Sequence, residues 1–142
     1  MNRLIAKITS CRWDQHKSDL MHIRRRVFVE EQQVDEGDEW DPSDPDHYHF
    51  LAFIGSEAVG CGRLVGDGQI GRMAVLAKYR NQGIGGQLLR FMIGFARVND
   101  LENVFLHAQT HAIPFYSRFG FESHGQVFYE AGIPHQAMKL LC

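Results

Sequence analysis

The segment "KYRNQGIGGQLL" (78–89) places Gly83, Gly85 and Gly86 within four positions and then turns apolar. At the N-terminus of a helix the backbone N–H groups lack partners, and the helix dipole favours negative charge there. Glycines leave room for a ligand to approach these groups closely. The segment therefore predicts a phosphate-binding turn between a strand and a helix.

Known phosphate motifs match this segment only in part. A Walker A loop requires Lys-Ser or Lys-Thr after its last glycine, and neither dipeptide follows here. The dinucleotide fingerprint GxGxxG begins at Gly83 and Gly85, but its third glycine falls on Leu88. A glycine-rich turn that binds no ligand stays an open alternative.

The elements that would position this turn follow from hydrophobic periodicity. Strands are predicted at 4–9, 48–55, 57–66, 69–79, 103–109 and 135–141, and helices at 19–31, 84–98 and 112–120. The order β-α-β-β-β-α-β-α-β predicts an α/β (α+β) fold with a mixed sheet and helices on its faces. A length of 142 residues fits a single domain spanning 1–142.

Composition narrows the class of protein. A net charge of −2 argues against a broad nucleic-acid surface. The three cysteines, Cys11, Cys61 and Cys142, form no CxxC pair, which suits a reducing compartment. The sequence has neither the apolar region of a signal peptide nor a membrane-length apolar run. We therefore expect a cytoplasmic protein that binds neither nucleic acid nor a membrane.

Eight histidines make metal binding worth testing. His47 and His49 would share one face of a strand, and His107 and His111 are four positions apart. Neither pair has a third ligand at a recognised zinc spacing. We expect no metal, and a metal-dependent hydrolase remains an alternative that a metal assay would decide.

Two motifs together resemble the GNAT superfamily of N-acetyltransferases. "RNQGIG" (80–85) is similar to its [QR]-x-x-G-x-[GA] signature, and "QTHAIPFYSRFGF" (109–121) is similar to its second motif, with Gln109 where Asn is common. Upstream, "RRRVFVEEQ" (24–32), an acidic stretch and His49 resemble the ElaA-type subgroup. The resemblance covers nearly the whole chain.

This resemblance implies a GNAT-like, mostly antiparallel sheet and acetyl-CoA as co-substrate. The implied cofactor contacts are the backbone of Met73, Ala74 and Val75 for the pantetheine arm, the turn of Arg80, Asn81, Gln82, Gly83, Ile84, Gly85 and Gly86 for the pyrophosphate, and Gln109. The β-strand that ends at Val75 is expected to separate from its neighbour near 104–108. Dimers are common in the family, so a homodimer stays open.

Acetyl transfer to an amine also needs groups that move protons. By resemblance, Tyr116 is expected to protonate the departing thiolate, with a packing role in the aromatic cluster as the alternative. A lysine-like amine has a pKa near 10.4, so deprotonating it at pH 7 costs about 4.6 kcal/mol. The strand before the signature offers no carboxylate or imidazole. Glu31 and His49 are therefore the candidate bases, and a salt bridge to Arg24 or Arg25 is the alternative for Glu31.

The acidic stretch 35–47 contains seven carboxylates and Trp40. It is expected to form a loop, which either attracts a cationic amine or simply faces water. The sequence thus predicts an acetyl-CoA-dependent N-acetyltransferase that acts on a primary amine of a small molecule or peptide. A non-catalytic acyl-CoA-binding domain of the same fold is the alternative.

Overall fold

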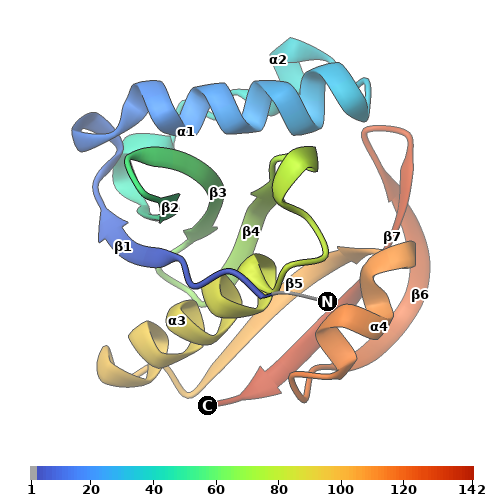
Figure 1. Ribbon diagram of the computed structural model, residues 1–142. Helices are drawn as coiled ribbons and strands as arrows, with labels where there is room; N and C mark the ends of the chain where they lie inside the picture. The colour runs from blue at the N-terminus through green and yellow to red at the C-terminus, as the bar shows by residue number, and fades with distance from the viewer. Residues whose placement is uncertain (1–2) are drawn as a thin grey trace.

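The computed structural model describes residues 3–142, which form a seven-stranded sheet of order β1-β2-β3-β4-β5-β7-β6 (Figure 1). Its neighbouring strands are antiparallel except for the parallel pair β4–β5. The elements are β1 Lys7–Cys11, α1 Lys17–Arg24, α2 Glu36–Glu39, β2 Tyr48–Ile54, β3 Glu57–Leu64, β4 Gln69–Val75, α3 Ile84–Val98, β5 Asn103–Gln109, α4 Ile113–Ser117, β6 Glu122–Glu130 and β7 Ile133–Leu141. The predicted fold class is confirmed.

Helices cover both faces of the sheet (Figure 1). Because successive side chains of a strand point to opposite faces, Phe50 of β2 packs in the core beneath α3, while Leu51 packs in the core beneath α1. The apolar residues of α4 join the core on the α3 side. Of the helices in residues 3–142, none is long and apolar enough to cross a membrane.

Glycines in β3 let α3 lie close to the sheet. A Cβ on Gly62 would stand 2.6 Å from Met92 Sδ, and one on Gly60 would stand 2.9 Å from Leu88 Cδ1. Both distances are shorter than van der Waals contact, so a larger residue at either position would force the Met92 or Leu88 side chain of α3 to shift. These close contacts set the distance of α3, and hence of its N-terminus, from the sheet.

The helix predicted at 19–31 is present, but its second half is wound more widely. After α1, residues Arg25–Glu31 form a π-helix, and the N–H of Gln32 donates to the carbonyl of Val27 five positions earlier at 3.1 Å. π-helical turns are rare and occur often at functional sites. The sequence pattern did not distinguish this winding from an α-helix.

The acidic stretch 35–47 is not the open loop that was expected. It contains the short helix α2 and folds two of its carboxylates, Glu39 and Asp44, into the protein at 3% and 1% exposure. Arg24 of α1 donates to Glu39 Oε2 at 2.8 Å and to Asp44 Oδ2 at 3.1 Å. These carboxylates therefore neither face water nor offer free charge to an amine.

Two further arginines complete this buried charge cluster, which we define as Arg24, Glu39, Asp44, Arg63 and Arg72. Arg63 Nη1 lies 2.9 Å from Asp44 Oδ1, and Arg72 Nε lies 3.1 Å from Glu39 Oε2. The cluster ties α1 and α2 to strands β3 and β4. It thereby holds α2 to two central strands of the sheet.

Strand β6 is absent from the predicted order. Apolar and polar residues do not alternate along this strand, because almost all of its residues are exposed, and Gly125 lies in the middle of it. An edge strand that buries neither face carries no hydrophobic period in its sequence. The hairpin β6–β7 is the main correction to the predicted topology.

Strands β4 and β5 pair over a short distance only. In the described chain, their register consists of Gln69 opposite Phe105 and Ile70 opposite Leu106. Beyond these positions the two strands separate, so Met73–Val75 has no ladder partner on the β5 side. The predicted separation of these strands is confirmed.

Candidate active site

Two cavities meet where β4 and β5 separate. The α3-side cavity has a volume of about 920 Å³ and is lined by the glycine turn, the first turn of α3 and α4. The β7-side cavity has a volume of about 660 Å³ and is lined by β4, β5, β7 and the segment that follows α1. Both cavities are lined by Met73, Ala74, Val75, Arg80, His111, Ala112 and Tyr116. Two ligands bound on either side would therefore meet beside β4.

The α3-side cavity has the features of an anion site. Gly83 is the N-cap of α3 with φ 87°, a left-handed conformation that L side chains rarely adopt, and no side chain caps the helix. The first N–H groups of this 15-residue helix are therefore left for a ligand. Six of the seven predicted turn residues line this cavity, and Gln82 does not.

The glycines of the turn serve different purposes. Gly83 is required by its backbone conformation, whereas a Cβ on Gly86 would stand 3.0 Å from Phe119 Cζ. Gly86 thus lets the turn that follows α4 approach the first turn of α3. The prediction that all three glycines make room for a phosphate needs this refinement, because Gly86 makes room for an aromatic ring.

Arg80 joins the glycine turn to two other elements. Its Nε donates to the carbonyl oxygen of Val75 at 2.8 Å, and its Nη1 and Nη2 donate to the two carboxylate oxygens of Glu31 at 2.8 Å each. The alternative that Glu31 forms a salt bridge is supported, but its partner is Arg80. Arg24 and Arg25 pair instead with carboxylates of the acidic stretch.

The backbone of β4 presents polar groups to the junction of the cavities. The N–H of Leu76 donates to Val59 of β3 at 2.9 Å. Because N–H groups alternate in direction along an extended chain, the N–H of Val75 points to the opposite edge, which faces the cleft. On that edge, Met73–Val75 has no ladder partner from β5 in the described chain.

Tyr116 of α4 lines both cavities. Its hydroxyl lies 3.8 Å from Met73 Sδ, and desolvation by burial raises the pKa of Tyr116 to about 12. The phenol is therefore protonated throughout the neutral range. Its ring also packs on Phe115 and Phe121, so the expected packing role and a role in the site coexist.

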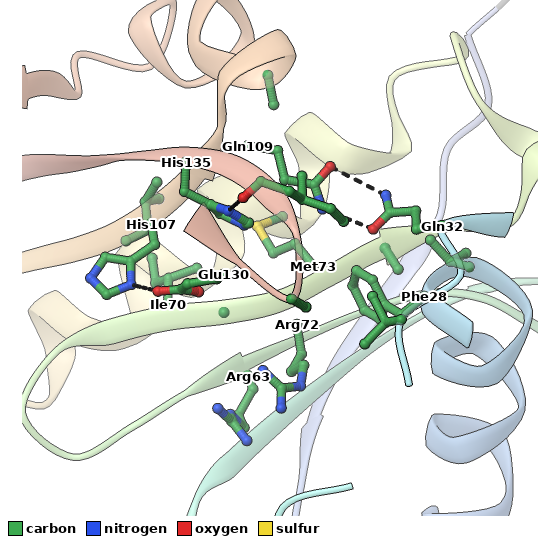
Figure 2. Close-up of a pocket in the computed structure, with 18 of the residues that line it drawn as sticks. Phe28, Gln32, Arg63, Ile70, Arg72, Met73, His107, Gln109, Glu130 and His135 are labelled. Atoms are coloured by element: carbon green, nitrogen blue, oxygen red, sulfur yellow. Dashed lines mark hydrogen bonds and ion pairs between the residues drawn. The ribbon is translucent and has the colours of Figure 1, made fainter. Parts of the chain in front are cut away.

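The β7-side cavity is closed on one side by a pair of amides (Figure 2). Gln109 Nε2 donates to Gln32 Oε1 at 2.8 Å, and Gln32 Nε2 donates to Gln109 Oε1 at 3.3 Å. The pair joins the end of β5 to the end of the π-helix. Gln109, predicted as a cofactor contact, lines this cavity and not the α3-side cavity.

Imidazoles and a carboxylate line the opposite wall of the same cavity (Figure 2). His107 Nδ1 lies 2.6 Å from Glu130 Oε1, and His135 Nδ1 lies 2.7 Å from the carbonyl oxygen of Ile133. Phe128 lies between the two rings, 5.0 Å from His107 and 6.1 Å from His135. These groups come from β5, β6 and β7.

The two predicted bases are not among the residues that line either cavity. Glu31 has both carboxylate oxygens bound by Arg80. His49 is 0% exposed, its Nε2 lies 2.8 Å from the carbonyl oxygen of Asp44, and its ring packs on Trp13. Desolvation by burial lowers the pKa of His49. The structure thus places His49 beside the buried charge cluster and away from the cleft.

Residues 18–142 match the acetyltransferase (GNAT) domain. The chain belongs to the GNAT acetyltransferase family. It is 34% identical over 131 residues to the uncharacterized N-acetyltransferase YjcF of Bacillus subtilis, covering 89% of this chain and 94% of the relative. It is 32% identical over 127 residues to the ElaA protein of Escherichia coli, covering 84% of this chain and 83% of the relative.

Solved structures agree with this membership in the GNAT family. An acyl-CoA N-acyltransferase from Pseudomonas aeruginosa superimposes with a TM-score of 0.85 at 29% identity, covering 95% of this chain and 99% of that one. The crystal structure of Escherichia coli ElaA gives a TM-score of 0.84 at 28% identity, with the same coverage of both chains. The ElaA-type resemblance is confirmed, and the chain is an acyltransferase of the GNAT family, which uses acyl-CoA donors.

The sequence patterns missed two residues that line the β7-side cavity, His107 and Glu130. His107 was considered only as half of a metal pair, and Glu130 lies in the strand that was not predicted. Among residues 3–142, no group of three or more His, Cys, Asp or Glu side chains is arranged to hold a metal ion. The alternation of Phe105, His107 and Gln109 along β5 was the available signal that their side chains share one face.

Proposed function

We propose that this protein transfers the acetyl group of acetyl-CoA to a primary amine of a small molecule or peptide, by direct attack of the amine on the thioester. The observation that carries the proposal is the junction of the two cavities at Met73–Val75, beside Tyr116. A cofactor on the α3 side and an amine on the β7 side would meet there. One GNAT domain spanning 1–142 would hold both.

The α3-side cavity would hold the cofactor. The turn from Arg80 to Gly86 would bind the pyrophosphate through main-chain N–H groups, with the dipole of α3 favouring the anion. The free edge of Met73–Val75 would pair with the amides of the pantetheine arm. This arrangement would bring the thioester carbonyl to the N–H of Val75, which would stabilise the developing oxyanion.

Tyr116 would act on the leaving thiolate. A thiol has a reference pKa near 8.5, well below the pKa of about 12 of Tyr116. Complete proton transfer from this phenol to the sulfur is therefore uphill, and the favoured role is a hydrogen bond donated to the thiolate as the C–S bond breaks. Glu31 would keep Arg80, and through it the carbonyl of Val75, in position.

The first test is binding and turnover. CoA and acetyl-CoA should raise the melting temperature, because a ligand that binds only the native state stabilises it. Purified enzyme with acetyl-CoA and a panel of α-amino acids, dipeptides and polyamines should release CoA, measured by chromatography, and form the N-acetyl product, measured by mass. A thermal shift without product from any amine would favour the acyl-CoA-binding alternative.

The second test concerns Tyr116. Tyr116→Phe keeps the ring and should lower kcat by 10-fold to 100-fold while leaving the affinity for acetyl-CoA unchanged. Tyr129→Phe is the matched control, since Tyr129 is 72% exposed on β6. Equal kcat values for the two variants would remove Tyr116 from the mechanism.

A further inference from the structure

The proposed reaction leaves one requirement without a residue, namely a base that deprotonates the amine. At pH 7 a lysine-like amine is neutral in about one molecule in 2,500. Glu31 is bound by Arg80, and His49 is buried away from the cleft. The walls of the β7-side cavity, where an amine would bind, are the remaining place for such a base.

We infer that His107 is the general base of this site and that Glu130 is its positioning residue, with the β6–β7 hairpin bringing the carboxylate to the imidazole. His107 Nδ1 lies 2.6 Å from Glu130 Oε1. An ionised carboxylate can only accept a hydrogen bond, so Nδ1 carries the hydrogen and Nε2 carries the lone pair. His107 lines the β7-side cavity and not the α3-side cavity.

The partner of His107 distinguishes it from His135, the imidazole on the neighbouring strand β7. His135 Nδ1 is held by the carbonyl oxygen of Ile133, so its tautomer is fixed in the same way. When His107 accepts a proton, however, the positive charge forms beside a carboxylate, which stabilises it. The partner of His135 is a neutral carbonyl oxygen, which stabilises a positive charge only through its dipole. The His135 side chain is also buried, at 8% exposure.

Other charged groups also face this cavity. Besides His107 and Glu130, the lining includes two acidic side chains, three arginines and two imidazoles: Asp38, Glu39, Arg63, Arg72, Arg80, His111 and His135. Glu39 is paired with Arg24 and Arg72 in the buried charge cluster. Glu130 is thus the carboxylate in direct contact with His107.

The proton and bond changes balance as follows, given the proposed function on which this inference rests. His107 Nε2 takes one proton from the ammonium group, and the neutral nitrogen attacks the thioester carbon. The C–N bond forms and the C–S bond breaks. The second proton leaves the nitrogen and ends on the CoA sulfur, and His107 returns its proton to solvent.

The test compares His107→Gln with wild type over pH 6 to 10, using the best amine of the panel. At pH 7 the variant should lose about 100-fold in kcat/KM, within the usual range for general base catalysis. The kcat/KM of the variant should then rise with pH and approach that of wild type, because at high pH the amine is already deprotonated in solution. CoA affinity by calorimetry should not change. A loss of equal size at every pH, or no loss, would overturn the assignment.

Three further measurements test whether the loss comes from the His107–Glu130 pair. Hydroxylamine, which is largely neutral at pH 7, should be acetylated by wild type and His107→Gln at rates within about 3-fold, since it needs no base. Glu130→Gln should lose about 10-fold at pH 7 and show the same recovery at high pH. His124→Gln, at an exposed position of β6 that lines neither cavity, should behave as wild type.

The outcomes separate the two proposals. A wild-type enzyme that acetylates no amine and no hydroxylamine would overturn the proposed function and this inference together. Normal wild-type transfer with an unchanged pH profile in His107→Gln would overturn only the inference. A high-pH recovery seen in His135→Gln or His111→Gln and not in His107→Gln would assign the base to that residue and overturn the inference.

Discussion

The buried charge cluster makes Arg24→Met the most informative single change to stability. Arg24 is 1% exposed and donates to Glu39 Oε2, to the carbonyl oxygen of Glu39 and to both oxygens of Asp44, at 2.8 to 3.2 Å. Methionine fills much of the same space but leaves those acceptors without their main donor. Removing one partner of a buried ion pair typically lowers the free energy of unfolding by about 3–5 kcal/mol.

The lower end of that range applies here, because Arg63 still faces Asp44 and Arg72 still faces Glu39. At about 2.1 cal/mol/K per residue, unfolding of this chain has an entropy of about 0.3 kcal/mol/K. A loss of about 3 kcal/mol therefore lowers the melting temperature by about 10 °C. Urea unfolding at pH 7 should give the same free-energy difference.

The pH dependence of the stability of Arg24→Met tests why the variant is less stable. Desolvation by burial already raises the pKa of Glu39, and Arg72 and Arg24 oppose that shift. Removing Arg24 raises the pKa further, so the folded variant binds a proton that the unfolded chain does not. Its stability must then increase as the pH falls towards 5, and the difference from wild type must narrow.

Arg26→Met is the control for this prediction. Arg26 belongs to the same helical segment, is 60% exposed and pairs with Glu30 at 3.4 Å, so its loss should change stability by no more than about 0.5 kcal/mol. If Arg24→Met costs less than about 1 kcal/mol, or if the difference from wild type widens as the pH falls, the cluster does not act through paired buried charge.

Three other predictions follow from local features. Gly83→Ala should cost about 1–2 kcal/mol and weaken CoA binding, measured by urea unfolding and calorimetry, because φ is 87° at this position; an unchanged affinity would contradict the assigned role of the turn. A thiol reagent should label Cys142 alone in the native protein and three thiols after denaturation, since Cys142 is exposed and the others are buried; a second fast thiol would contradict this. Asp41 has its pKa lowered to about 2, chiefly by the hydroxyl of Ser43, so Asp41→Asn should destabilise the protein at pH 7 and progressively less as the pH falls from about 4 towards 2; a loss independent of pH in urea unfolding would exclude this cause.

The sequence predicted those parts of the fold that bury a face. Helix α3 and strand β5 were predicted with the boundaries that the structure has, because each carries a strong hydrophobic period. Strand β6 was missed because its exposed residues carry none. The glycine turn was recognised from residue types alone, since its requirement is local: a left-handed residue followed by a helix N-terminus.

The residues of the β7-side cavity could not be predicted in this way. His107 and Glu130 are 23 positions apart and lie on strands that are not neighbours in the sheet. Their meeting depends on how the β6–β7 hairpin bends back, which no local pattern encodes. Glu31 shows the same limit, because its partner Arg80 is 49 positions away and lies on the glycine turn.

The short pairing of β4 with β5 also bears on how the chain folds. Strands β1 to β4 follow one another as antiparallel neighbours, and β5 to β7 form a second antiparallel set. Within the two sets, the hairpins β2–β3, β3–β4 and β6–β7 can form early, because the chain loops that they close are short. The seam between them has two ladder pairs, and α3 packs against both β4 and β5. A molecule of CoA lying along Met73–Val75 would occupy this seam, so cofactor binding would protect the amides of both halves against hydrogen exchange and slow the opening of one half from the other.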